Sequence, residues 1–304
     1  MSRSPTVPLV LLVIAVVFYF WQLGRPDIIT DESSYAARAI GMVDFDFGIE
    51  QPTPWQWVSE VPWWMRLSFH DHPPLVFLLQ HYSIKLFGEN PFAVRLPSVL
   101  AGLAAVWLLY LIGKRLHSPA VGLASAALFA FTVNHVWISR IGLQESVAIA
   151  LTLSSFWAFL KAFEQPPGPS ASRSLDRTNV MQPRRAARGA WRWALLSGVL
   201  LGLAVLTKYL ALILLPIFAT LTARGLLARK SEHNYDRNYT RKAAGRLGLM
   251  LTALAIVASP VFAYNVQLYR NFGHFDFQFS LLLGQDVPAW QARPGQEVLG
   301  PLSE

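Results

Sequence analysis

The chain has 304 residues, of which 53% are hydrophobic and only 14% are charged. This composition is too apolar for an ordinary soluble domain and predicts a polytopic membrane protein. The absence of cysteine excludes disulfides and thiolate metal sites. A formal net charge of +8 could suggest a nucleic-acid partner, but in a membrane protein basic residues mainly mark the loops that stay in the cytoplasm.

The first apolar run, residues 7–23, follows a short N-terminus that carries Arg3. These features also suit a signal peptide, but no small-x-small cleavage site follows the run, so we expect a retained span. Six further apolar segments come close to the roughly 20 residues that cross a bilayer core. They cover residues 92–113, 120–136, 147–163, 193–206, 210–221 and 247–264, and residues 207–209 form a tight connection between two of them.

Charge bias orients these spans. If the N-terminus is cytoplasmic, the cytoplasmic segments, including basic loops at residues 164–192 and 224–246, hold most of the 26 basic residues but few of the 18 acidic ones. This asymmetry predicts seven spans with the N-terminus inside. The transmembrane domain is then expected over residues 1–265, and residues 266–304 form an extracytoplasmic tail.

The segment between the first two spans, residues 25–91, is expected outside the cytoplasm. Four tryptophans and three prolines lie between residues 52 and 64, and aromatic residues at this density are typical of the lipid headgroup region. Residues 75–87 are apolar, but the stretch is short and contains Gln80, His81 and Lys85, so we expect an interfacial helix. A spanning helix here would invert the charge bias of every later loop.

The loop at residues 165–192 opens with Pro166-Pro167-Gly168-Pro169 and is rich in arginine. This pattern predicts a disordered linker that lies against anionic lipid. No aromatic residues alternate with the arginines, so nucleic-acid binding is not expected.

The stretch Thr30-Asp31-Glu32-Ser33-Ser34-Tyr35 places two adjacent carboxylates just after the first span. Tyr35, Ala39, Ile40 and Val43 recur at helical spacing, which predicts a short amphipathic helix. The carboxylates could serve as an acid/base site at the membrane surface. They could equally be the favourable first residues of that helix.

Ionisable residues from three other loops are expected on the same outer face, and such residues at span ends are functional candidates. His70 and His72 flank Asp71 and could bind a metal, although no third ligand stands at a recognisable spacing. Arg140 could pair with Glu145. Lys208 could be an interfacial residue, or it could neutralise a phosphate together with Arg140.

Five motifs in this order resemble the family 39 type of GT-C glycosyltransferases, which includes protein O-mannosyltransferases and the aminoarabinose transferases that modify lipid A. The motifs are TDESSYA at residues 30–36, HPPL at 72–75, LFGENPFAVRLPS at 86–98, RIGLQE at 140–145 and GLAVLTK at 202–208. Residues 264–273 look, more loosely, like the family's region after the seventh span.

The resemblance implies an all-α, GT-C type transmembrane helical bundle, with interfacial helices after the first span. It also implies an inverting transfer of a sugar from a polyprenyl-phosphate donor to a lipid or protein acceptor, on the outer side of a membrane such as the bacterial inner membrane. Asp31 matches the general base, and Glu32 would position that carboxylate or the acceptor. Tyr35, His72 and Glu145 are expected to contact substrate, and Arg140 and Lys208 to hold the donor phosphate. No cofactor and no obligatory metal is implied, because the leaving group is already an anion.

Two departures from the family pattern are visible. Glu145 stands where the family usually has Asp, and family members generally continue with further spans beyond the length of this chain. We therefore expect a short member or one that needs a partner chain for the missing part. The alternative is a non-catalytic structural subunit of a larger membrane complex. A transporter is disfavoured, because the charges collect at span ends.

Overall fold

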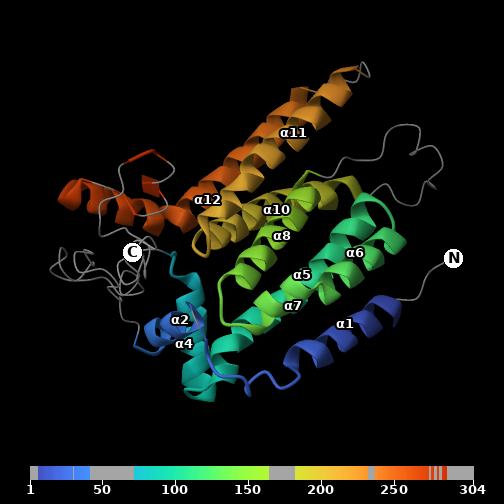
Figure 1. Cartoon of the computed structure of the whole chain (residues 1–304). Coiled ribbons are helices and arrows are strands. Elements are labelled where there is room, and N and C mark those ends of the chain that lie inside the picture. The colour runs from blue at the N-terminus through green and yellow to red at the C-terminus, as the bar shows by residue number, and fades with distance from the viewer. Residues whose placement is uncertain are drawn as a thin grey trace, which may run out of the picture.

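A computed structural model describes residues 6–29, 31–41, 72–163, 182–231, 237–273, 275–276, 279–280 and 283–285 of the chain. Every secondary-structure element in these ranges is a helix, which confirms the predicted all-α membrane fold (Figure 1). The elements are α1 (Thr6–Phe20), α2 (Asp31–Gly41), α4 (Leu75–Phe87), α5 (Pro91–Leu116), α6 (Pro119–Phe131), α7 (Val133–Arg140), α8 (Glu145–Ala162), α10 (Gln182–Val205), the 3-10 turn η2 (Tyr209–Ile213), α11 (Leu214–Ser231) and α12 (Arg237–Phe272).

Two apolar clusters hold the bundle together. In the first, α1, α5 and α6 pack around Tyr19, Val99 and Val106. In the second, α8, α10, α11 and α12 pack around Phe159 and Phe218, among other buried side chains. Helix α5 also packs against α8 and so joins the two halves, while α2 and α4 lie together at one end of the bundle (Figure 1).

Small residues let the helices approach closely. A Cβ atom on Gly198 of α10 would lie 2.1 Å from the carbonyl oxygen of Met250 in α12. Ser155 of α8 and Ser197 of α10 each donate a hydrogen bond from the hydroxyl to the other's carbonyl, at 2.9 and 3.0 Å. Such contacts favour helix association in a membrane, where lipid tails are as apolar as the side chains.

Local sequence explains where two of the helices begin. Asn90 precedes α5 and accepts a hydrogen bond from the Ala93 N–H at 3.0 Å, and Ser118 caps α6 in the same way through the Val121 N–H at 3.2 Å. A proline follows each cap, where its fixed φ and missing N–H suit the first turn of a helix.

Among the described residues, three regions are long and apolar enough to cross a membrane: within α5, η2 with α11, and α12. The pair α6 and α7 makes a fourth if it is counted as one bent span. Large apolar side chains such as Val13, Leu128 and Ile256 remain exposed, as expected of surfaces that contact lipid. The predicted count of seven spans stays a prediction.

Several predicted boundaries were wrong. The expected span at residues 120–136 is broken at Thr132, where the chain bends by 63°. Helix α10 begins at Gln182 inside the expected disordered linker, and α11 and α12 extend into the expected basic loop at residues 224–246. Arginine and alanine are good helix formers, so these helices continue beyond their apolar parts.

Candidate functional site

The expected helix at Asp31 is present as α2, and a buried ion pair fixes its first turn. Glu32 is fully buried, and its two carboxylate oxygens accept hydrogen bonds from the Nε and Nη2 atoms of Arg95 in α5, each at 2.8 Å. The Arg95 guanidinium also donates to the backbone carbonyls of Leu23, Pro26 and Asp27, each at 2.9 Å. Hydrogen bonds from Arg95 therefore hold the residues that connect α1 and α2.

Glu32 also holds the loop between α7 and α8. Its Oε1 accepts a hydrogen bond from the Gly142 N–H at 2.7 Å, and Gln80 of α4 donates to the Gly142 carbonyl oxygen at 2.7 Å. A Cβ atom on Gly142 would lie 3.1 Å from Glu32 Oε1 and 2.6 Å from a methyl group of Val94, so only glycine fits here without displacing its neighbours. Both carboxylate oxygens of Glu32 already accept hydrogen bonds. This geometry favours a role for Glu32 in positioning Asp31 over direct contact with an acceptor.

Asp31 differs from Glu32, because its side chain is exposed at the N-terminal end of α2. Tyr35, one turn further on, is buried and packs edge-to-face on His72 and Phe77, with ring centroids 5.4 and 5.0 Å apart. Ala39 is buried on the predicted apolar face, but Ile40 is 44% exposed, so that face is narrower than predicted. Val43, His70, Asp71 and the tryptophan-rich stretch lie outside the described residues.

The turn after α10 joins the same end of the bundle. The Leu75 N–H at the start of α4 donates to the carbonyl oxygen of Leu206 at 3.0 Å, so the segment that carries His72 lies beside the turn that carries Lys208. Lys208 Nζ donates to Glu145 Oε1, at the start of α8, at 2.8 Å. Both side chains are about one-third exposed, and Glu145 Oε2 is buried with no hydrogen-bond partner within the described part of the chain.

The predicted alternative that Arg140 pairs with Glu145 was wrong. Arg140, the last residue of α7, donates instead to the backbone carbonyls of Phe18 and Trp21, at 3.4 and 2.5 Å. The two side chains end up apart because Glu145 opens the next helix, α8, where Lys208 reaches it. Arg140 thus anchors the C-terminal end of α1.

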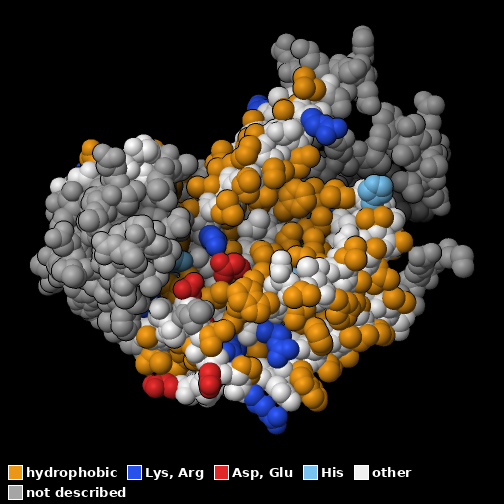
Figure 2. All heavy atoms as spheres, in the orientation of Figure 1, with side chains coloured by type: hydrophobic (Ala, Val, Ile, Leu, Met, Phe, Trp, Pro, Cys, Tyr) orange, Lys and Arg blue, Asp and Glu red, His pale blue; other side chains and the backbone are white. Residues whose placement is uncertain are grey.

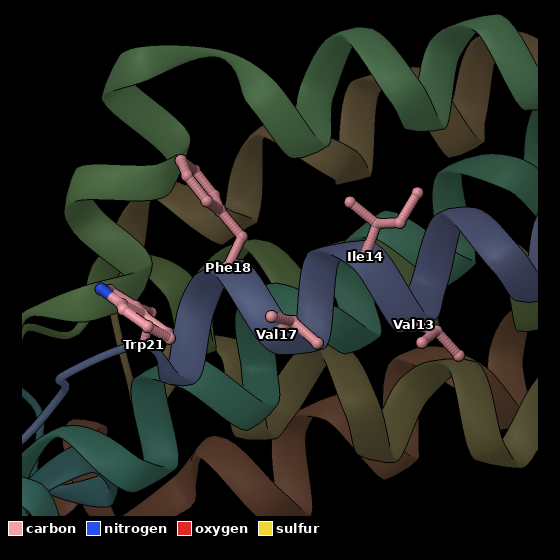
Figure 3. Close-up of a pocket in the computed structure, with 5 residues that line it drawn as sticks. All are labelled: Val13, Ile14, Val17, Phe18 and Trp21. Atoms are coloured by element: carbon pink, nitrogen blue, oxygen red, sulfur yellow. The ribbon is translucent and has the colours of Figure 1, made fainter.

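Figure 3 shows the residues that line an apolar groove of about 450 Å³ beside α1. Val13, Ile14, Val17 and Phe18 lie on α1, Trp21 follows its last residue, and none of these side chains is ionisable. In a membrane such a surface faces lipid chains, so we do not assign the reacting groups to it.

The candidate site residues lie elsewhere. In Figure 2, acidic and basic side chains lie together at the end of the bundle that holds α2 and α4, whereas most of the remaining described surface in this view is apolar. Hydrogen bonds, a ring contact and an ion pair join the start of α2, the segment at His72, the start of α8 and the turn at Lys208 into one connected region. An exposed carboxylate and a partly exposed ammonium in one region can accept a proton and bind an anion.

Sequence reasoning missed several residues that build this region. Arg95 lies within a recognised motif, but its pairing with a residue 63 positions away leaves no local signal. The sequence predicts Gln80 only as a polar residue of an interfacial helix, whereas the structure buries its side chain. Sequence reasoning also missed Tyr209, Asn265 and Asp276. Asp276 accepts hydrogen bonds from Tyr209, the residue after Lys208, and from Asn265 of α12, so it joins α12 to the turn that follows Lys208.

The fold is that of the GT-C membrane glycosyltransferases, which confirms the resemblance carried by the five motifs. Residues 71–169 match the family described as dolichyl-phosphate-mannose-protein mannosyltransferase. Over 132 residues the chain is 33% identical to the undecaprenyl phosphate-alpha-4-amino-4-deoxy-L-arabinose arabinosyl transferase of Pseudomonas aeruginosa. The aligned residues make up 43% of this chain and 22% of that protein.

Two solved structures share the fold. The protein O-mannosyltransferase Pmt1-Pmt2 complex of S. cerevisiae, bound to its sugar donor, matches 90% of this chain and 34% of that chain, with a TM-score of 0.61 and 20% identity. The ArnT structure from Cupriavidus metallidurans, bound to undecaprenyl phosphate, matches 88% and 42%, with a TM-score of 0.54 and 20% identity. The chain therefore matches less than half the length of these proteins.

Proposed function

We propose that the chain is a membrane glycosyltransferase that moves a sugar from a polyprenyl-phosphate donor to an acceptor hydroxyl on the extracytoplasmic side of a bacterial inner membrane. The observation that carries this proposal is that the four separate segments that carry Asp31, His72, Glu145 and Lys208 contact one another. The Pseudomonas aeruginosa transferase and the ArnT structure bound to undecaprenyl phosphate support the donor class.

In the proposed reaction, the acceptor oxygen attacks the anomeric carbon from the face opposite the phosphate, so the configuration inverts. Asp31 takes the proton of the acceptor hydroxyl, and the bond between the anomeric carbon and the phosphate oxygen breaks. The electron pair leaves with the polyprenyl phosphate. The exposed carboxylate of Asp31 suits a base, because the acceptor must reach it.

Lys208 is proposed to bind the donor phosphate and to stabilise the charge that grows on it. Its ammonium is one-third exposed and already paired with Glu145, so an arriving phosphate would meet a cation in a fixed position. Arg140 donates to the carbonyls of Phe18 and Trp21, and other donors of its guanidinium are proposed to contact a phosphate. Tyr35 and His72 form the wall beside Asp31 and would contact the sugar or the acceptor.

The test is sugar transfer in membranes that contain the wild-type chain, Asp31→Asn or Asp27→Asn. Asp27 is a matched control, because it is an exposed carboxylate nearby and only its backbone carbonyl serves Arg95. Asp31→Asn should lower the transfer rate by at least about 100-fold, the usual contribution of a general base, and Asp27→Asn should leave it unchanged. Near-normal transfer by Asp31→Asn would refute the assignment.

A second part of the proposal concerns partners. We propose that the chain works together with a partner chain, as the protein O-mannosyltransferase of yeast is a Pmt1-Pmt2 complex. A chain that tolerates both Asp31→Asn and Lys208→Ala, and that co-purifies with a stable partner, would instead be the non-catalytic subunit.

A further inference from the structure

The segment that follows α12 packs back against the turn that carries Lys208. Asp276 falls within the expected tail, yet its side chain is only 2% exposed. Its Oδ2 atom accepts hydrogen bonds from the Tyr209 hydroxyl at 2.7 Å and from Asn265 Nδ2 at 2.9 Å. Tyr209 and Asn265 are also buried.

The other polar atoms of Asp276 are engaged as well. Its N–H donates to Asn265 Oδ1 at 2.9 Å, and its Oδ1 accepts from the Phe279 N–H at 2.9 Å. The Ser280 N–H donates to the Asp276 carbonyl oxygen at 2.8 Å. A buried carboxylate is costly unless its hydrogen bonds are made, so a network in which every oxygen has a donor favours one arrangement.

This network is adjacent to Lys208 in the chain, because Tyr209 directly follows Lys208. Lys208 is the residue before η2, a 3-10 turn of five residues that begins at Tyr209, and no side chain caps the turn. Short 3-10 turns have weak hydrogen bonds of their own, so contacts from outside decide how firmly they are held. The bond from Tyr209 to Asp276, together with packing of the Tyr209 ring on Phe279 at 4.8 Å, supplies that contact.

We propose that Asp276 is a positioning residue: through Tyr209 it fixes the turn that carries Lys208, and so holds the Lys208 ammonium where the donor phosphate binds. The proposal rests on the proposed function, in which Lys208 binds that phosphate. It also gives Asp276, which lies after α12, a role in shaping the donor site.

The first test is binding of undecaprenyl phosphate to the purified 304-residue chain in detergent. Tyr209→Phe removes only the hydroxyl that Asp276 accepts from, and it should weaken binding about tenfold, because small displacements of a binding group carry large costs. Asp276→Asn should have a similar effect. Tyr110→Phe is the matched control, because Tyr110 has the same 9% exposure and lies in α5, away from this network.

A double variant separates positioning from a direct contact. If Asp276 and Tyr209 act only through Lys208, then Tyr209→Phe should add no further loss of binding in a Lys208→Ala background. Full additivity of the two losses would overturn the proposal.

The second test measures the turn itself. Since the chain has no cysteine and Leu210 in η2 is 68% exposed, Leu210→Cys gives a single site for a nitroxide spin label. Tyr209→Phe and Asp276→Asn should both raise the mobility of this label in protein that elutes as a single folded species. A purely structural role would lower the yield of folded protein without changing label mobility or affinity.

The outcomes distinguish this inference from the proposed function. Unchanged binding in Tyr209→Phe and Asp276→Asn, with binding lost in Lys208→Ala, would overturn the positioning role and leave the donor site standing. Unchanged binding in Lys208→Ala would overturn the donor site and the positioning role together.

Discussion

Asp31 and Glu32 are adjacent in the sequence, but their side chains lie in different environments in the structure. Asp31 is exposed, whereas Glu32 is buried in an ion pair with Arg95. Removing one partner of such a pair leaves an uncompensated buried charge and typically costs about 3–5 kcal/mol. Glu32→Ala should therefore lower stability in thermal unfolding in detergent by that amount, and Asp31→Asn should change it by less than about 0.5 kcal/mol. Equal stability of the two variants would contradict the anchoring role of Glu32.

Gly142 offers a second test at the residue scale. A methyl group there would meet Val94, Gln80 and Glu32 within 3.1 Å, in a loop that both Glu32 and Gln80 hold by hydrogen bonds. Gly142→Ala should destabilise the protein by about 1–3 kcal/mol, the usual range for overpacking a filled site. Since the loop leads to Glu145, the variant should also weaken binding of undecaprenyl phosphate. Unchanged melting and binding would show that the loop can move without cost.

The sequence predicts which residues lie on one face of the molecule, but it does not predict which side chains pair with each other. Motif order and span polarity predict that Asp31, His72, Glu145 and Lys208 share one face, and contacts in the structure connect their segments. Side-chain pairings across distant segments leave no periodic signal, so the partners of Glu32 and Lys208 could not be read from spacing.

At the scale of elements, close contact between α10 and α12 should be a main source of stability. Gly198→Ala would force a methyl group against the Met250 carbonyl oxygen, so it should separate the helices and lower the melting temperature. Gly248→Ala on α12 is the matched control, because a Cβ atom there meets nothing within 4 Å. That variant should be neutral or slightly stabilising, since alanine favours helix over glycine. Equal melting temperatures for the two variants would contradict tight packing at Gly198.

Apolar length predicted where helices exist but not where they bend or end. The break between α6 and α7 falls at Thr132, whose hydroxyl donates back to the Leu128 carbonyl oxygen and whose backbone is extended. No proline or glycine stands at that position, so no residue there predicts a helix break. Hydropathy predicts loops at the polar beginnings of α10 and α12, because it detects only the apolar part of a helix.

At the scale of the whole molecule, the charge bias predicts the sidedness of every loop. In the cysteine-free chain, Glu89→Cys should react with a membrane-impermeant maleimide in intact spheroplasts, because the link between α4 and α5 is predicted outside. Ser170→Cys, in the basic loop predicted inside, should react only after the membrane is permeabilised. The reverse pattern would put Asp31 in the cytoplasm and contradict the proposed side of the reaction.

The central claim is that this bundle transfers a sugar from a polyprenyl phosphate, and the most direct measurement is turnover. The purified 304-residue chain, reconstituted with lipid and protein acceptors, is supplied in turn with a panel of undecaprenyl-phosphate sugars, and released undecaprenyl phosphate is measured. The account predicts release from at least one donor by the wild-type chain and loss of that release in Asp31→Asn. Failure of every donor both to bind and to release undecaprenyl phosphate would contradict it.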